Sequence, residues 1–266
     1  MPHITPARFL DRVVTIALIG CGGNGSQMLT GLARLNHALC ALGHPGLHVC
    51  AFDPDTVSEA NMGRQLFGAF DVGSSKAHVL VNRINAFFGL EWQAHFGRWD
   101  TAKVQPDILI CCVDSAKSRH EIMRSYGDTR AAYIMDMGNR AADGQVLFGE
   151  PDGYDSRVVV PPGSARLPDP YRVLSELVDL TAIEDDTPSC GLAQALERQE
   201  LFINQAVVTP ALSILWEFFR HGRLSWHGAF VNLRTGSMRP LLVKDAAPAP
   251  EATEAEELRV RVEVSL

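Results

Sequence analysis

The 266-residue sequence has no excess of basic residues and no long apolar run. Its 24 Lys and Arg residues are outnumbered by 31 Asp and Glu residues, which gives a net charge of −7. Surfaces that bind nucleic acids are usually basic, so nucleic acid is disfavoured as the main partner. The most apolar long window covers residues 206–219 and contains Pro210 and Glu217. It is too short to span a bilayer, so we interpret it as a core helix.

Paired cysteines and a leader peptide are lacking too. None of the six cysteines forms a C-x-x-C pair, and Cys111 and Cys112 would point to opposite faces of a strand. A disulfide framework and a four-thiolate zinc site are therefore not expected. The first residues contain no apolar segment with a small-residue cleavage site, as a signal peptide would. These features predict a protein of the reducing cytoplasm.

Apolar strands alternate with helical segments over the first 150 residues. Expected strands cover residues 13–20, 48–53, 107–114, 131–138 and 145–150, and expected helices cover residues 26–42, 74–88 and 115–126. Such alternation is typical of parallel sheets with right-handed crossovers. It predicts a Rossmann-like, doubly wound, mostly parallel α/β fold.

The pattern changes after Glu150. Residues 151–170 are rich in Pro, Gly and Asp and predict a long loop, of the kind often used for binding. Helices are then expected at residues 171–180 and 192–220, the second bent at Pro210, followed by a hairpin that turns near residues 234–236. An acidic linker starts at residue 245, and the last nine residues have the alternation of an edge strand. We therefore expect one domain over residues 1–244, with a helix and β-hairpin extension, and a linker and tail over residues 245–266.

A glycine-rich stretch, GCGGNG, directly follows the first strand and opens a helix. Gly20, Gly22 and Gly25 have the spacing G-x-G-x-x-G, and Gly23 adds a further glycine. Glycines let the backbone approach an oxyanion, and the start of a helix presents free N–H groups. In this strand–turn–helix context the motif predicts a phosphate site, without deciding which nucleotide is bound.

An acid ends the second strand. Asp53 is placed to accept the hydroxyl groups of a ribose, and Asp55 could do the same or could cap the turn. NAD and ATP both carry this ribose, so the acid does not discriminate between them.

Two cationic residues follow the second strand, and they help to distinguish ATP from NAD. Arg64 and Lys76 lie beyond the second strand, where a triphosphate would need more positive charge than a dinucleotide does. Lys76 begins a helix, where a cation is not favoured by the helix dipole. Asn61 and Gln65 add neutral polar groups, and Asp114 ends a buried strand at the same sheet edge, in a place that suits Mg²⁺.

Taken singly, these residues have simpler interpretations. Arg64 and Lys76 could be solvated surface charges, and Asp114 could cap the helix that follows it. Their convergence at one edge favours ATP and a metal ion.

The motifs GCGGNGS, DPDTVSEANMGRQLF, GSSKA and CCVDSAKSR occur in this order and resemble the adenylating domain of the ThiF/MoeB/E1 superfamily. The resemblance covers residues 13–139, with a looser match over residues 190–242. The D-x-D-x-V-x-x-x-N-x-x-R-Q stretch is highly specific, whereas the glycine loop is not. Within the superfamily, residues 189–219 and the following hairpin resemble the ThiF-like proteins of bacterial PRTRC gene clusters.

The resemblance implies ATP- and Mg²⁺-dependent adenylation of the C-terminal carboxylate of a small ubiquitin-like β-grasp protein, by an enzyme that is commonly a homodimer. It also implies the following roles. The glycines line the phosphates and Asp53 binds ribose, while Asn61, Arg64 and Lys76 address the triphosphate. Asp114 would be the magnesium ligand and catalytic acid, and Gln65 matches the motif without an assigned role.

Cys190 precedes a predicted helix, whose N-terminus would favour the thiolate. It could accept the activated acyl group as a thioester, as relatives of the E1 type do, or it could be an incidental loop cysteine. Many relatives bind structural zinc through two C-x-x-C pairs, and this chain has neither.

Two rival functions stay open. An NAD(P)-dependent oxidoreductase would explain the glycines and Asp53, but would leave Arg64, Lys76 and Asp114 without a task. A non-catalytic ThiF-like scaffold would bind a partner without adenylating it.

Overall fold

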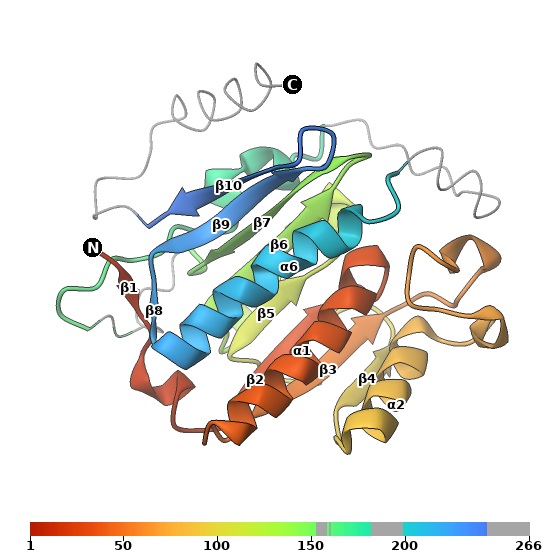
Figure 1. The fold of residues 1–266 in the computed structure, drawn as a ribbon, viewed down its shortest axis with the longest axis horizontal. Helices are drawn as coiled ribbons and strands as arrows, with labels where there is room; N and C mark the ends of the chain where they lie inside the picture. The colour runs from red at the N-terminus through yellow and green to blue at the C-terminus, as the bar shows by residue number, and fades with distance from the viewer. Residues whose placement is uncertain (153–158, 160, 182–198, 244–266) are drawn as a thin grey trace.

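A computed structural model of the chain describes residues 1–152, 159, 161–181 and 199–243. Its centre is an eight-stranded sheet with the strand order β10-β9-β7-β6-β5-β2-β3-β4 (Figure 1). Neighbours from β6 to β4 are parallel, whereas β7, β9 and β10 are joined antiparallel. The strands are β2 (Val14–Ile19), β3 (Leu47–Asp53), β4 (Gln93–Phe96), β5 (Ile108–Cys111), β6 (Tyr133–Asn139), β7 (Asp143–Gly149), β9 (Trp226–Asn232) and β10 (Ser237–Leu242).

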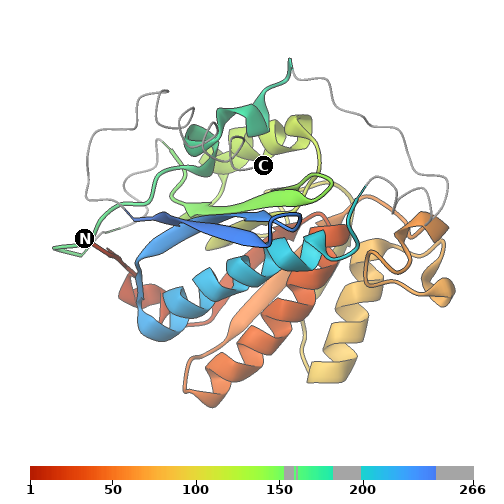
Figure 2. The ribbon, with the colours of Figure 1, turned by 45° about the horizontal axis from the view of Figure 1, so that its top comes forward.

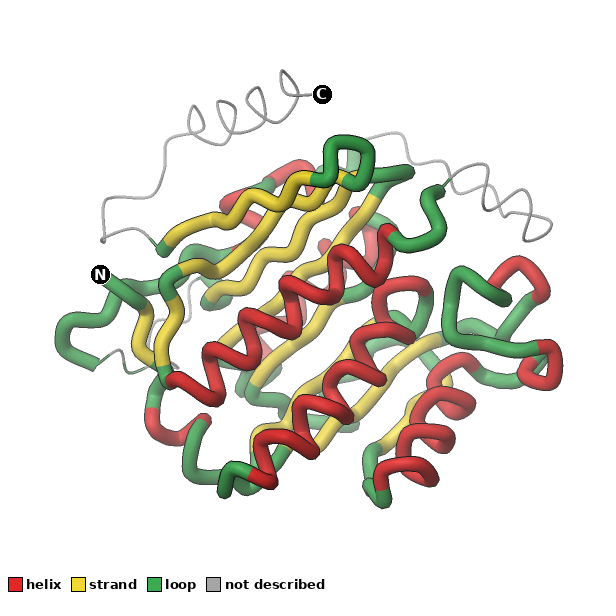
Figure 3. Tube along the Cα trace, viewed as in Figure 1, coloured by secondary structure: helices red, strands yellow, loops and turns green. Residues whose placement is uncertain are grey.

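Helices cover both faces of the sheet. One face carries α1 (Gly23–Ala41), α2 (Lys76–Phe88) and α6 (Ile203–Trp216), which lie side by side across the strands (Figure 3). The other face carries α3 (Ala116–Arg124) and the short α4 (Pro170–Val173) (Figure 2). The central strands are apolar on both sides because each side faces a core. This arrangement confirms the Rossmann-like, doubly wound prediction, with the sheet mostly parallel.

One local prediction was wrong, and three features were not predicted. Strand β7 follows β6 as an antiparallel hairpin partner, because residues 140–142 are too few for a crossover. Strand β4 was not predicted, since as a half-exposed edge strand it lacks an apolar run. The helix expected at residues 171–180 is broken at Leu174, where φ is −130° and ψ is 84°. A two-stranded sheet of β1 (His3–Ile4) and β8 (Arg223–Leu224) was also missed, because two-residue strands carry no periodicity.

The long C-terminal helix is shorter than predicted within the described part of the chain. Helix α6 begins at Ile203, continues through Pro210 and ends in a π-helical turn over residues 217–221. Its buried apolar residues confirm the interpretation of this segment as a core helix. Among the described residues, no helix has the length and apolar character needed to cross a membrane. The predicted terminal edge strand lies outside the described residues.

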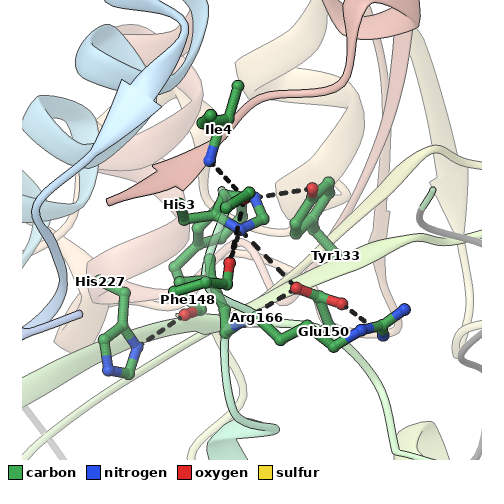
Figure 4. Close-up of polar contacts among 10 residues, drawn as sticks. His3, Ile4, Tyr133, Phe148, Glu150, Arg166 and His227 are labelled. Carbon is green, nitrogen blue, oxygen red and sulfur yellow. Dashed lines mark hydrogen bonds and ion pairs between the residues drawn. The ribbon is translucent and has the colours of Figure 1, made fainter. Parts of the chain in front are cut away.

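A buried histidine, His3, links the N-terminal segment to the sheet through hydrogen bonds (Figure 4). One ring nitrogen of His3, Nδ1, lies 2.8 Å from the carbonyl oxygen of Ala165, and Nε2 lies 2.9 Å from the hydroxyl of Tyr133. A neutral ring satisfies both contacts, donating at Nδ1 and accepting at Nε2. Glu150 lies 3.8 Å from Nδ1 and is itself paired with Arg166 at 2.8 Å. Burial lowers the pKa of His3.

Because buried histidines resist protonation, we expect the folded protein to lose stability in mild acid. Burial lowers the pKa of His227 as well as that of His3, so the unfolded chain takes up protons near pH 6.5 that the folded chain does not. We expect the free energy of unfolding to fall between pH 7.5 and 5.5, by up to about 1.4 kcal/mol per pH unit for each histidine. Urea unfolding across this range measures the effect, and His3→Gln should flatten the curve. A wild-type stability that does not change with pH would contradict the prediction.

Candidate functional site

The glycine loop joins β2 to α1 in a turn that only small residues can form. Gly20 has φ +92°, a region that favours glycine, and its N–H donates to the carbonyl of Phe52 at 2.8 Å. Gly22 is the N-cap of α1 and has no side chain to cap the free N–H groups of the first turn. A Cβ on Gly25 would lie 1.9 Å from the carbonyl oxygen of Gly20. The helix therefore starts in contact with the turn, with its free N–H groups at the carboxyl edge of the sheet.

Gly25→Ala should destabilise this turn, although alanine usually favours a helix. The added methyl group meets backbone rather than a movable side chain, so we expect a loss of about 1–3 kcal/mol, as in overpacked cores. Gly22→Ala is the matched variant, because a Cβ there meets nothing within 4 Å. Thermal unfolding of both variants measures the difference. Equal melting temperatures would show that the close approach is unimportant.

Acidic and basic side chains meet just beyond β3. The Asp53 carboxylate is 4% exposed and accepts hydrogen bonds from the N–H groups of Cys21 and Asp55. Burial raises the pKa of Asp53, while these two hydrogen bonds oppose the change. Lys76, the first residue of α2, is buried and pairs with Asp55 at 2.9 Å. The structure thus brings Asp53, Asp55 and Lys76 together beside the glycine loop.

The Asn-x-x-Arg-Gln segment forms a tight turn. Gly63 has φ +76°, and the side-chain oxygen of Asn61 accepts from the N–H and hydroxyl of Ser58 at 2.9 and 3.1 Å. The oxygen of Asn61 therefore holds the turn. The turn lies against α1, because the N–H of Leu66 donates to the Ser26 hydroxyl at 3.3 Å.

Arg64 reaches from this turn toward the end of β5. Burial lowers the pKa of its guanidinium, and the negative charge of Asp114 opposes that change, so the two residues are electrostatic neighbours. Its Nη1 donates to the side-chain oxygen of Gln199, whereas its buried Nε has no hydrogen-bond partner within the described segments of the chain. The sequence did not reveal Gln199, which follows Arg64 by 135 residues and belongs to no motif.

A cleft of about 270 Å³ opens next to Gly20, between the segments that follow β3, β4 and β5. Pro54, Trp99 and Val113 contribute apolar surface, and the Trp99 ring meets Phe52 edge-on at 5.0 Å. Clefts with apolar walls at this edge suit flat aromatic groups such as a nucleobase. The sequence did not indicate that Trp99 lines this cleft, because the strand that precedes Trp99, β4, was not recognised.

A buried ion pair supports the turn that carries Asp114. Arg119 of α3 donates through Nε to Asp136 of β6 at 3.0 Å and through Nη2 to the carbonyl of Val113 at 2.7 Å. The hydroxyl of Tyr171 also donates to Asp136, at 3.1 Å. Burial alone would lower the pKa of Arg119, but the charge of Asp136 raises it above its usual value. The pair thus holds the residue that precedes Asp114.

The model of the ThiF family matches residues 10–223, most of the chain. The chain belongs to the ThiF family. Two solved structures share the fold of this ThiF-family chain at 14% identity and a TM-score of 0.56 each. PaaA is matched over 86% of this chain and 64% of its own, and E. coli MccB with MccA-N7isoASN over 89% and 66%. This chain therefore spans slightly less than two thirds of either structure. A comparison with curated protein sequences gives no match.

The predicted site also includes Asp114 and Cys190. Asp114 is exposed, and no cluster of three or more His, Cys, Asp or Glu side chains that could hold a metal ion occurs within the described residues. A lone carboxylate still fits Mg²⁺, because this ion is usually held by one or two carboxylates together with substrate phosphates. Cys190 lies outside the described residues.

Proposed function

We propose that this ThiF-family chain uses ATP and Mg²⁺ to adenylate the C-terminal carboxylate of a small ubiquitin-like β-grasp protein. The convergence of positive groups around the start of α1 supports this proposal most directly. The free helix N-terminus, Arg64 and Lys76 lie at one edge of the sheet, and the cleft next to Gly20 adjoins it. In an NAD site the glycine loop and the helix N-terminus already meet the charge of the pyrophosphate, whereas a triphosphate has further negative charge for the two cations to neutralise.

The proposed reaction joins two anions, so neutralising charge is the main task of the site. A carboxylate oxygen of the partner forms a bond to the α-phosphorus, the bond from that phosphorus to the bridging oxygen breaks, and pyrophosphate leaves. Arg64 and Lys76 would stabilise the developing negative charge electrostatically. Lys76 would exchange its contact with Asp55 for the phosphates. Mg²⁺ held with Asp114 would supply further positive charge.

The finer parts of the proposal rest on the family resemblance. They are a homodimer, the PRTRC subtype, and transfer of the acyl group to Cys190 as a thioester, whereas the proposed cytoplasmic location rests on the cysteine pattern and the first residues of the sequence. Substitution of Cys190 by Ser should abolish a DTT-sensitive adduct if that last step occurs.

The test is ATP–pyrophosphate exchange with the partner present. The full chain is purified under Mg-ATP, and small proteins that co-purify are assayed with it. Exchange should require the partner and should be lost when the last residue of the partner is removed. A partner that binds tightly but supports no exchange would favour the non-catalytic scaffold instead.

A further inference from the structure

Helix α6 brings a buried amide to the first residue of α1. Asn204 is the second residue of α6 and is 3% exposed. A Cβ placed on Gly23 would lie 2.5 Å from Oδ1 of Asn204 and 2.6 Å from its Nδ2. The starts of the two helices lie next to each other in Figure 1. The carboxamide thus points at the helix end that forms the phosphate loop.

This contact explains the extra glycine of the loop. The spacing G-x-G-x-x-G needs Gly20, Gly22 and Gly25, and it leaves the residue between Gly22 and Asn24 unconstrained. Any side chain at position 23 would occupy the space of the Asn204 carboxamide. Gly23 therefore keeps room for Asn204.

The amide nitrogen of Asn204 is an unused donor. Within the described part of the chain, Nδ2 is fully buried and has no hydrogen-bond partner. Buried polar atoms of native proteins nearly always have partners, and an exception points to a missing ligand or water. The carboxamide lies at a helix N-terminus that has no side-chain cap and no acidic residue in its first turn.

Other unpaired atoms belong to segments that meet at the same turn. Among the residues that the structure describes, the donor Nε of Arg64 has no partner, and neither do the acceptors Oδ1 of Asn24 and Oε1 of Gln65. Unpaired donors beside a positive helix end suit an anion. The acceptors suit water molecules that hydrate that anion. Together the atoms are typical of a site built for a hydrated phosphate.

We propose that Asn204 is a phosphate-binding residue, whose Nδ2 donates to a non-bridging oxygen of the nucleotide bound at the start of α1. This inference rests on the proposed function and adds a residue from α6 to proposed nucleotide ligands that otherwise come from the first 114 residues. A hydrogen bond from Asn204 would make binding of the triphosphate depend on how α6 packs against α1. Adenosine, which has no phosphate, does not use the residue.

The test compares two buried asparagines, Asn204 of α6 and Asn36 of α1. Asn204→Asp replaces the donor by an oxygen and adds a negative charge, and Asn204→Ala removes the donor without adding charge. Asn36→Asp is the control, because Asn36 is also buried but lies near the other end of α1, where its Oδ1 accepts from the N–H of Leu47 at 2.7 Å. Isothermal titration calorimetry of the folded full chain gives the affinities for Mg-ATP and adenosine.

We expect both Asn204 variants to bind Mg-ATP about 10–100-fold more weakly, the effect of losing a hydrogen bond to a charged group. Their affinity for adenosine should stay at the wild-type value, and Asn36→Asp should bind both ligands normally. Unchanged Mg-ATP affinity in the Asn204 variants would overturn this inference alone. An equal loss for adenosine would overturn it too, since it would show a purely structural role. Absence of Mg-ATP binding in the wild type would overturn the proposed function as well.

Discussion

Arg64→Ala should lower ATP–pyrophosphate exchange by about 10²–10³-fold, the usual effect of removing one preorganised group that stabilises transition-state charge. The guanidinium is half buried next to Asp114, so water cannot fully replace the charge stabilisation that it provides. No described residue pairs with its Nε atom, which can therefore donate to a phosphate oxygen. Exchange measured at saturating ATP and partner gives the rate ratio.

Arg34→Ala is the matched control for this variant. Arg34 is an exposed arginine of α1, away from the start of the helix, and its removal should leave exchange unchanged. Both variants should melt close to the wild type. If Arg64→Ala exchanged pyrophosphate at the wild-type rate, Arg64 would have no part in catalysis.

Arg119→Met should destabilise the protein by about 3–5 kcal/mol, because it leaves the Asp136 carboxylate buried without its cation. Asp136 is fully buried and would keep only the hydroxyl of Tyr171 as a donor among its side-chain contacts. Urea unfolding at neutral pH measures the loss.

Adding Asp136→Asn to Arg119→Met should recover part of the lost stability. The neutral amide removes the uncompensated charge, which is the main cost of breaking a buried pair. A double variant that is no more stable than the single variant would show that packing by Arg119, rather than its charge, is responsible. Either variant also frees the carbonyl of Val113, so a loosened Asp114 turn should accompany the loss.

The sheet could be predicted because its strands are buried on both faces. Such strands have continuous apolar runs, and β2, β3 and β5 are easily recognised. Strand β4 has the burial of an edge, so its sequence QAHF carries little signal. The direction of β7 was predictable in principle, since residues 140–142 leave no room for a helix.

The grouping of some candidate site residues at one edge of the sheet could be predicted as well. Asp53, Lys76 and Asp114 follow strands or begin helices at one sheet edge, so topology alone brings them together. Gln199 and Asn204 could not be found in this way. Gln199 precedes α6 and belongs to no motif, and Asn204 comes close to the start of α1 because α6 packs against that helix. An asparagine in a helical segment has no motif that marks it as a donor to phosphate.

The most direct measurement of the central claim is the shift in melting temperature caused by Mg-ATP compared with NADH. A ligand present at 100 times its dissociation constant stabilises the fold by about 2.7 kcal/mol, which corresponds to roughly 5–10 °C for a domain of this size. We expect such a shift with Mg-ATP, a smaller one with Mg-ADP and none with NADH. A shift with NADH and none with Mg-ATP would contradict it.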